Sequence, residues 1–152
     1  MGWSAGSDVA DATMKRDMTA LKTLIQRKAE VNAPQIDGAT ALHWAVYYND
    51  TESLDLLLAN GANVKARNRE GITPLYMACL YGTSEIVGKL LKAGADAREV
   101  APNGETTLML AARNGNPATI KLLAAAGADV NARETVRGTT ALMWAAEQSH
   151  PE

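Results

Sequence analysis

Apolar residues recur along this chain in short blocks that have the spacing of amphipathic α-helices. In one block Leu75, Ala78 and Cys79 lie three and four positions apart, which places them on one face of a helix. Thr73 is a favourable N-cap, because its hydroxyl accepts a hydrogen bond from an otherwise unpaired backbone N–H. The proline that follows is favoured at the first helical position, where no N–H is needed. The pattern therefore predicts a short helix that a break at Tyr81 and Gly82 ends.

A second apolar stripe follows in the same segment. Ile86, Val87, Leu90 and Leu91 again have helical spacing, and Gly94 can adopt the left-handed conformation that ends a helix. An extended excursion with a turn then leads to the next cap. One unit is thus a helix, a tight turn, an antiparallel helix and a projecting loop. Helices of about ten residues are not stable alone in water, so the pattern predicts that neighbouring units stack to bury a shared core.

This unit recurs at a fixed period, which indicates a repeat protein. Gly38, Gly71 and Gly104 are 33 residues apart, and Gly138 follows after 34. Threonine, leucine and alanine positions repeat at the same spacing. The expected organisation is a tail (1–7) and a single domain (8–152), which consists of a degenerate repeat (8–34), full repeats (35–67, 68–100 and 101–133) and a half repeat (134–152).

The repeated segments closely resemble the ankyrin repeat family. The loop–helix junctions read GATALHWAV, GITPLYMAC, GETTLMLAA and GTTALMWAA, and the closing segments read GANVKA, GADARE and GADVNA. The likeness extends from about Asp8 to Glu152. It implies an all-α fold, an α-solenoid in which helix-turn-helix units stack and β-hairpin-like loops project. The first repeat departs from the pattern at Lys28, where later repeats have glycine, and a left-handed residue other than glycine costs about 1 kcal/mol.

Charge and hydropathy exclude several classes of function. The net charge is −2 at pH 7 and no basic stripe is evident, so nucleic acid is not an expected partner. No run approaches the roughly 18 apolar residues of a transmembrane helix, so no membrane association is expected. The chain also starts without the apolar run of a secretory signal, which favours the cytoplasm but leaves the compartment unknown.

No combination of residues predicts catalysis, a cofactor or a metal site. His43 stands at the histidine of the family's TPLH motif, and the resemblance implies that it hydrogen-bonds the loop to the helix start. The second histidine, His150, is far away in the sequence. Segment 82–89 (GTSEIVGK) has the wrong spacing for a phosphate-binding loop, and Leu90 stands where Ser or Thr would bind magnesium. Cys79 has no evident base beside it, so we expect a small core residue.

The ankyrin resemblance implies a partner-binding surface at the ends of the first helices and at the loops, which line a concave groove in the family. Tyr47 and Tyr48 close one first helix, and aromatic side chains suit a surface that must be both apolar and hydrogen-bonding. The candidate partner-binding residues are Trp44, Tyr47, Tyr48, Arg69, Ile72, Leu80, Tyr81, Glu105, Arg113, Asn114, Trp144 and Glu147.

The expected function is therefore a non-catalytic scaffold that binds another protein through its concave helix face and loop tips. One alternative is a regulatory or targeting segment of a larger enzyme or assembly. Another is a structural module that self-associates through the C-terminal half repeat. Both arise because HPE at 150–152 stands where a second helix would begin, which would leave Leu142, Met143 and Trp144 poorly covered. A longer parent chain is favoured over end-to-end association.

Overall fold

The structure is a computed structural model that describes residues 7–148. The expected tail, apart from Ser7, and the expected end at 149–152, including His150, lie outside the described residues. Residues 7–148 form nine α-helices and no strand, which confirms the predicted all-helical fold. The helices are α1 (Asp8–Met14), α2 (Met18–Gln26), α3 (Ala41–Tyr47), α4 (Thr51–Ala59), α5 (Pro74–Tyr81), α6 (Ser84–Lys92), α7 (Thr107–Arg113), α8 (Pro117–Ala125) and α9 (Ala141–Gln148).

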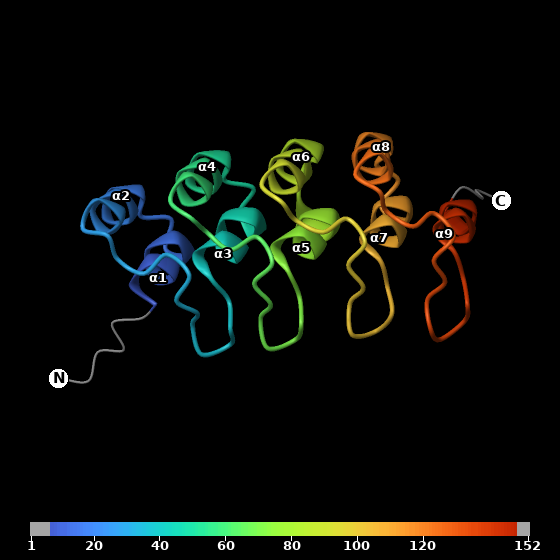
Figure 1. Cartoon of the computed structure of the whole chain (residues 1–152), viewed down its shortest axis with the longest axis horizontal. Coiled ribbons are helices and arrows are strands. Elements are labelled where there is room, and N and C mark those ends of the chain that lie inside the picture. The colour runs from blue at the N-terminus through green and yellow to red at the C-terminus, as the bar shows by residue number, and fades with distance from the viewer. Residues whose placement is uncertain (1–6, 149–152) are drawn as a thin grey trace. The chain divides into compact units, whose positions relative to one another are not determined.

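The chain divides into two compact units, Met1–Pro74 and Leu75–Glu152. In the first unit α1 packs against both α2 and α3, and α3 packs against α4. The first helices of the repeats, α1 and α3, lie side by side, and α2 and α4 form a second layer, above them in Figure 1. Large aliphatic side chains fill the space between the layers. Those that are buried include Val9, Leu21, Leu42, Leu54 and Leu57.

The second unit repeats this arrangement. Helix α7 packs against α8 and α9, and α6 packs against α8. Loops project from the first-helix layer in both units (Figure 1). The aliphatic core of the second unit includes Leu75, Ile86, Leu90, Leu108 and Leu123.

The ends of the helices follow from local chemistry. Each second helix begins after a short polar residue whose side chain accepts a hydrogen bond from a backbone N–H of the first turn, the favoured N-cap arrangement. Gly94 has φ +100°, which confirms the predicted left-handed end of α6. Lys28 has φ +57°, so the first repeat does place a strained residue where the others have glycine. The N-caps of the second helices are Asp17, Asp50, Thr83 and Asn116.

The projecting loops are closed by backbone hydrogen bonds across their bases. The amide of Asn68 donates to the carbonyl of Ile72 at 3.1 Å, and the corresponding bond runs from Glu134 to Thr139 at 3.0 Å. The last loop thus holds one additional residue within the same closure. In the second unit a single β-bridge joins Val100 and Thr106. These bonds agree with the expected hairpin-like loops.

The expected lack of cover at the C-terminal half repeat is correct for two residues and wrong for the third. Leu142 is 78% exposed and Met143 44% exposed. Trp144 is only 6% exposed. Because α9 packs against α7, the side of α9 that carries Trp144 is covered, whereas Leu142 and Met143 stay exposed among residues 7–148. As for the membrane, none of the helices within 7–148 is both long and apolar enough to cross one.

Candidate partner-binding surfaces

In the first unit the predicted aromatic residues form one cluster at the end of α3. The rings of Trp44 and Tyr48 are nearly parallel, with an interplanar angle of 25° and a centroid distance of 5.9 Å. Tyr47 meets both rings edge-on, at 5.8 Å from Trp44 and 5.2 Å from Tyr48. Tyr47 is 52% exposed, and the other two rings are half-buried. The cluster therefore presents aromatic surface to solvent while its members support one another.

Polar contacts hold this aromatic cluster in place. The indole N–H of Trp44 donates to Oε1 of Gln35 at 2.7 Å, and Nε2 of Gln35 donates to Oδ1 of Asp11 at 2.6 Å. The guanidinium of Arg16 lies 5.3 Å from the centroid of the Tyr48 ring, a cation–π distance. These contacts restrain the indole and one tyrosine ring.

His43 has the structural role that the resemblance implied. The backbone N–H of Thr40 donates to Nδ1 at 3.1 Å, so the ring proton belongs on Nε2, which donates to the carbonyl of Ile72 at 2.9 Å. The ring is buried, and burial lowers its pKa, which keeps it neutral. The backbone of Ile72, a predicted site residue, is therefore tied to the start of α3, and its side chain is half-buried.

Arg69 belongs to a loop that runs beside its neighbour in the first unit. Its backbone N–H donates to the carbonyl of Asp37 at 2.9 Å, and its side chain is exposed. A Cβ on Gly38 would lie 2.8 Å from the backbone nitrogen of Arg69, so only glycine allows the loops to approach this closely. The loop that carries Arg69 is thus held against the neighbouring loop of this unit by a backbone hydrogen bond.

In the second unit Tyr76 stands at the position that His43 has in the first, and it was not among the candidate residues. Its hydroxyl donates to Oε2 of Glu105 at 2.7 Å. Burial raises the pKa of Tyr76 to about 12, and the hydrogen bond and charge of Glu105 add to the shift. Glu105 is half-buried and held in one place by this bond. A tyrosine in the TPLH position was the available signal, since a longer side chain there can reach the next loop.

Charged residues gather next to Glu105. Nη1 of Arg113 lies 3.7 Å from Oε1 of Glu105, and its guanidinium lies 5.1 Å from the centroid of the Trp144 ring. Nη1 of Arg137 lies 3.6 Å from Oε1 of Glu147. These groups surround a hollow on the second unit. Its lining residues are Asn103, Glu105, Arg113, Glu134, Val136, Arg137, Trp144, Glu147 and Gln148.

The remaining predicted residues of the second unit lie at the ends of α5 and α7. Tyr81 is exposed and Leu80 is half-buried. The side-chain amide of Asn114 donates to the carbonyls of Cys79 and Leu80, at 2.7 and 3.3 Å. Asn114 thus fastens the end of α7 to the end of α5, a structural task that its position in the repeat did not reveal.

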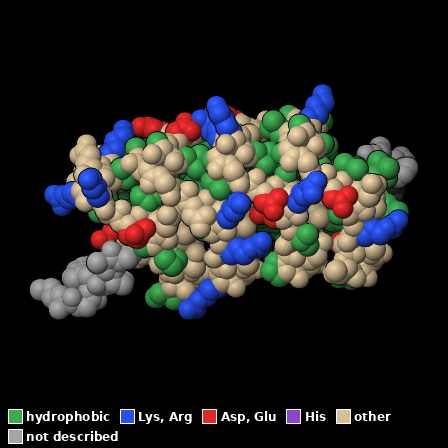
Figure 2. Space-filling model, in the orientation of Figure 1, with side chains coloured by type: hydrophobic (Ala, Val, Ile, Leu, Met, Phe, Trp, Pro, Cys, Tyr) green, Lys and Arg blue, Asp and Glu red, His purple; other side chains and the backbone are tan. Residues whose placement is uncertain are grey.

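The structure therefore groups the predicted residues by unit. In the first unit Trp44, Tyr47 and Tyr48 come together. In the second unit Glu105, Arg113, Trp144 and Glu147 come together around one hollow. The face in view in Figure 2 carries interspersed basic and acidic side chains.

The one cysteine, Cys79, is engaged in packing. Cys79 is buried, as expected for a core residue, and burial raises the pKa of its thiol to about 12, with a further contribution from the charge of Glu99. Such a thiol is not a nucleophile near neutral pH. Across residues 7–148 no three His, Cys, Asp or Glu side chains are grouped so that they could hold a metal ion.

Comparison with known proteins agrees with the fold. The family model described as ankyrin repeats in three copies matches residues 10–101 and, in a second match, 84–152. No curated protein matches the sequence. The matched segments together cover most of the chain, and they coincide with the helix pairs and loops described above. On this repeat architecture and this match, the chain belongs to the ankyrin repeat family.

Proposed function

We propose that this chain is a non-catalytic module that binds another protein through the first-helix ends and loops of its units. Ankyrin repeats are generally protein–protein interaction modules. The observation that carries the proposal is the supported aromatic cluster of Trp44, Tyr47 and Tyr48, which exposes ring surface at the end of α3. The charge of −2 favours a protein partner over nucleic acid.

Two physical features make the cluster suitable for binding. Tyrosine and tryptophan bury much apolar area while keeping a polar group, and they dominate the affinity of many protein interfaces. The contacts of Gln35 to Trp44 and of Arg16 to Tyr48 fix these rings in the free protein. Little conformational entropy is then lost when a partner docks, so more of the contact energy contributes to affinity.

A comparison of two variants in a quantitative pull-down tests the proposal. We expect the double substitution Tyr47→Ala and Tyr48→Ala to weaken capture of specific partners at least about tenfold, because two interface rings are removed. The matched control is Lys22→Ala with Glu52→Ala, which removes an exposed ion pair between α2 and α4 of the same unit. Circular dichroism should show unchanged helicity in both variants. Equal capture by both variants would refute the assignment of the aromatic cluster.

The exposed side of α9 supports a second candidate, self-association through the C-terminal half repeat. Leu108 of α7 is 4% exposed, whereas Leu142, at the same place in α9, is 78% exposed. Apolar side chains in such a position favour contact with another surface. Sedimentation velocity over a range of concentrations tests this candidate. A monomer at all concentrations, or an oligomer that the substitution Leu142→Glu leaves intact, would exclude it.

A further inference from the structure

The second unit has four arginines. Two of them donate hydrogen bonds to backbone carbonyls, and the other two form ion pairs instead. Arg98 donates to the carbonyl of Gly127 at 2.8 Å, and Arg133 donates to the carbonyl of Gly138 at 2.8 Å. These two fasten loops. The side chains of Arg113 and Arg137 make no hydrogen bond to any residue within 75–148. The carboxylates paired with them lie at 3.7 and 3.6 Å, beyond direct hydrogen-bond range.

Both of these arginines line the same hollow. Arg113 is held there by the ring of Trp144 beneath its guanidinium and by Glu105 at its side. Arg137 is exposed on the last loop. A guanidinium offers five N–H donors in a planar fork that matches a carboxylate. The hollow therefore holds two such forks that form ion pairs but no hydrogen bond within 75–148.

We propose that this hollow binds an acidic side chain on an extended segment of the partner protein, with Arg113 and Arg137 donating to its carboxylate. The proposal rests on the proposed protein-binding function and specifies its chemistry in the second unit. The Trp144 ring fixes one guanidinium, so that a single fork is already oriented. Arg137 completes the site by turning from Glu147 to the incoming carboxylate.

The three carboxylates that line the hollow have different roles. Oε2 of Glu105 accepts a hydrogen bond from the hydroxyl of Tyr76 at 2.7 Å and the carboxylate stays beside Arg113, so Glu105 is a positioning residue. Glu134 accepts hydrogen bonds from the amides of Val136, Arg137 and Thr139, which offset its charge. Glu147 is exposed and contacts only Arg137 among the residues described. It occupies the place of the partner's carboxylate in the free protein and competes with it.

This competition gives the proposal a directional test. Fluorescent ten-residue peptides of uniform Gly–Ser background, each with one central Leu and a single Glu, Gln or Lys three residues away, are titrated with the full chain at low salt, because salt screens exposed charges. We expect the Glu peptide to bind about tenfold more tightly than the Gln peptide, which corresponds to one charge-assisted hydrogen-bonded pair. The Lys peptide should bind most weakly.

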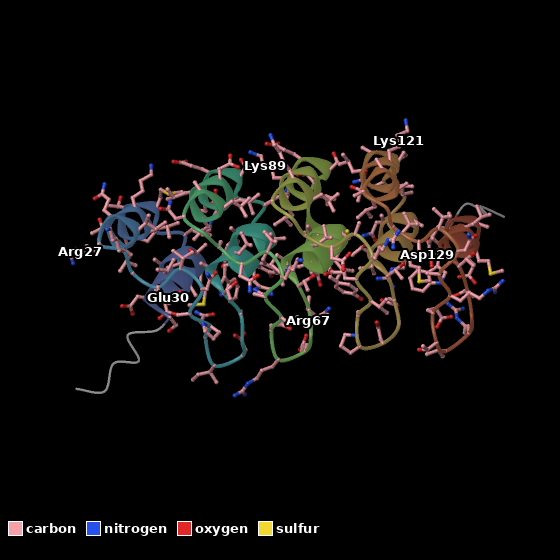
Figure 3. The ribbon with its side chains drawn as sticks, in the orientation of Figure 1. Arg27, Glu30, Arg67, Lys89, Lys121 and Asp129 are labelled. Atoms are coloured by element: carbon pink, nitrogen blue, oxygen red, sulfur yellow. The ribbon has the colours of Figure 1, made fainter. Side chains whose placement is uncertain are left out.

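Three variants then assign the effect to residues. Arg137→Gln and Arg113→Gln should each remove most of the preference for Glu over Gln. Glu147→Gln should strengthen binding of the Glu peptide about threefold, because it removes the internal competitor. Lys121→Gln is the matched control, since it removes one positive charge from α8, where Lys121 projects from the second-helix layer (Figure 3). This control should leave the preference unchanged.

Several outcomes would overturn the proposal. Tighter binding of the Lys peptide would make the site one for basic side chains. Weaker binding of the Glu peptide to Glu147→Gln would refute the competition between Glu147 and the partner's carboxylate for Arg137. Absence of any charge preference up to about 1 mM peptide would exclude a carboxylate site of useful affinity. The proposed function fails separately, because it depends on capture of whole partner proteins by the aromatic cluster of the first unit.

Discussion

The end of α3 in the first unit and the end of α7 in the second occupy the same place in the repeat but present opposite chemistry. Tyr47 and Tyr48 close α3 with two aromatic rings in edge-on contact, whereas Arg113 and Asn114 close α7 with a charge and an amide. The first surface is apolar and held by ring contacts, and the second is polar and held by ion pairs and hydrogen bonds. The contrast shows that the chemistry of these positions differs between units whose helix order is the same. Under the proposed function, these positions determine what each unit binds.

The positions that build the backbone are alike in the two units. Leu42 and Leu108 are both buried, and Gly38 and Gly104 both have positive φ. A Cβ on Gly104 would lie 2.6 Å from Oγ1 of Thr135 in the next loop, as close as the approach at Gly38. Substitutions at these shared positions should therefore affect stability, and substitutions at the helix ends should affect binding.

The largest expected effect on stability comes from one repeat position that is buried in α7 and exposed in α9. Leu108→Ala should lower the free energy of unfolding by about 3 kcal/mol, because it leaves a cavity in a packed core. Leu142→Ala, at the same place in α9, should change it by less than about 0.5 kcal/mol, because that side chain is 78% exposed. Urea unfolding followed by circular dichroism measures both. Similar losses for the two variants would mean that Leu142 is covered in solution.

A smaller effect is expected from the loop glycines. Gly138→Ala should cost about 1 kcal/mol, because Gly138 has φ +67° but an added Cβ would meet nothing within 4 Å. Gly104→Ala should cost about 2 kcal/mol, because the same backbone strain is joined by displacement of Thr135. Equal midpoints of thermal unfolding for the two variants would show that Thr135 can move away from an added Cβ at residue 104 without loss of stability.

Tyr76 stands where the first unit has His43, and its hydroxyl makes the stability of the second unit depend on pH in the alkaline range. The pKa of Tyr76 is raised from 10.0 to about 12, so its contribution to stability is complete below pH 10 and is lost as pH rises toward 12. Tyr76→Phe should lose about 1 kcal/mol at pH 7 and also lose this part of the alkaline dependence. Urea midpoints between pH 7 and 12 measure both. A variant that keeps the full alkaline dependence of the parent would assign it to other groups.

The smallest effect should distinguish the loops at acid pH. Asn68 and Glu134 occupy equivalent positions and both accept backbone amides of their own loop. The backbone amide hydrogen bond from Thr139 is the largest cause of the lowered pKa of Glu134, which falls from 4.5 to about 2. Its contribution is therefore complete above pH 4.5 and is lost as pH falls toward 2. Amide exchange of Thr139 and Ile72 should show faster opening in acid for the loop of Glu134 alone.

Much of the fold could be predicted because it depends on local chemistry. Helical spacing, the proline at the start of α5 and Gly94 at the end of α6 each determine structure within a few residues. The burial of Trp144 could not be predicted in this way, because it depends on which side of α9 faces α7. The bond from Tyr76 to Glu105 spans 29 residues and requires the actual spacing of the repeats.

The candidate residues were selected by their place in the repeat. That place indicates whether a side chain is exposed, but it does not indicate whether the side chain is hydrogen-bonded to a neighbouring helix. Tyr47 and Tyr48 lie as expected at an exposed helix end. Asn114 lies at the same place, but its side-chain amide donates hydrogen bonds to the carbonyls of Cys79 and Leu80. Position alone cannot separate these cases, because the difference is set by how far a side chain reaches toward the neighbouring helix.

The buried carboxylate of Glu134 shows how a repeat loop can accept an inserted residue. Its oxygens gather the amides of Val136, Arg137 and Thr139 inside a loop that has one residue more than the others, and α9 still docks on α7. An insertion is thus absorbed at the tip without shifting the register of the helix that follows. Grafted recognition segments could be accommodated at this loop by keeping the glutamate and the closing threonine.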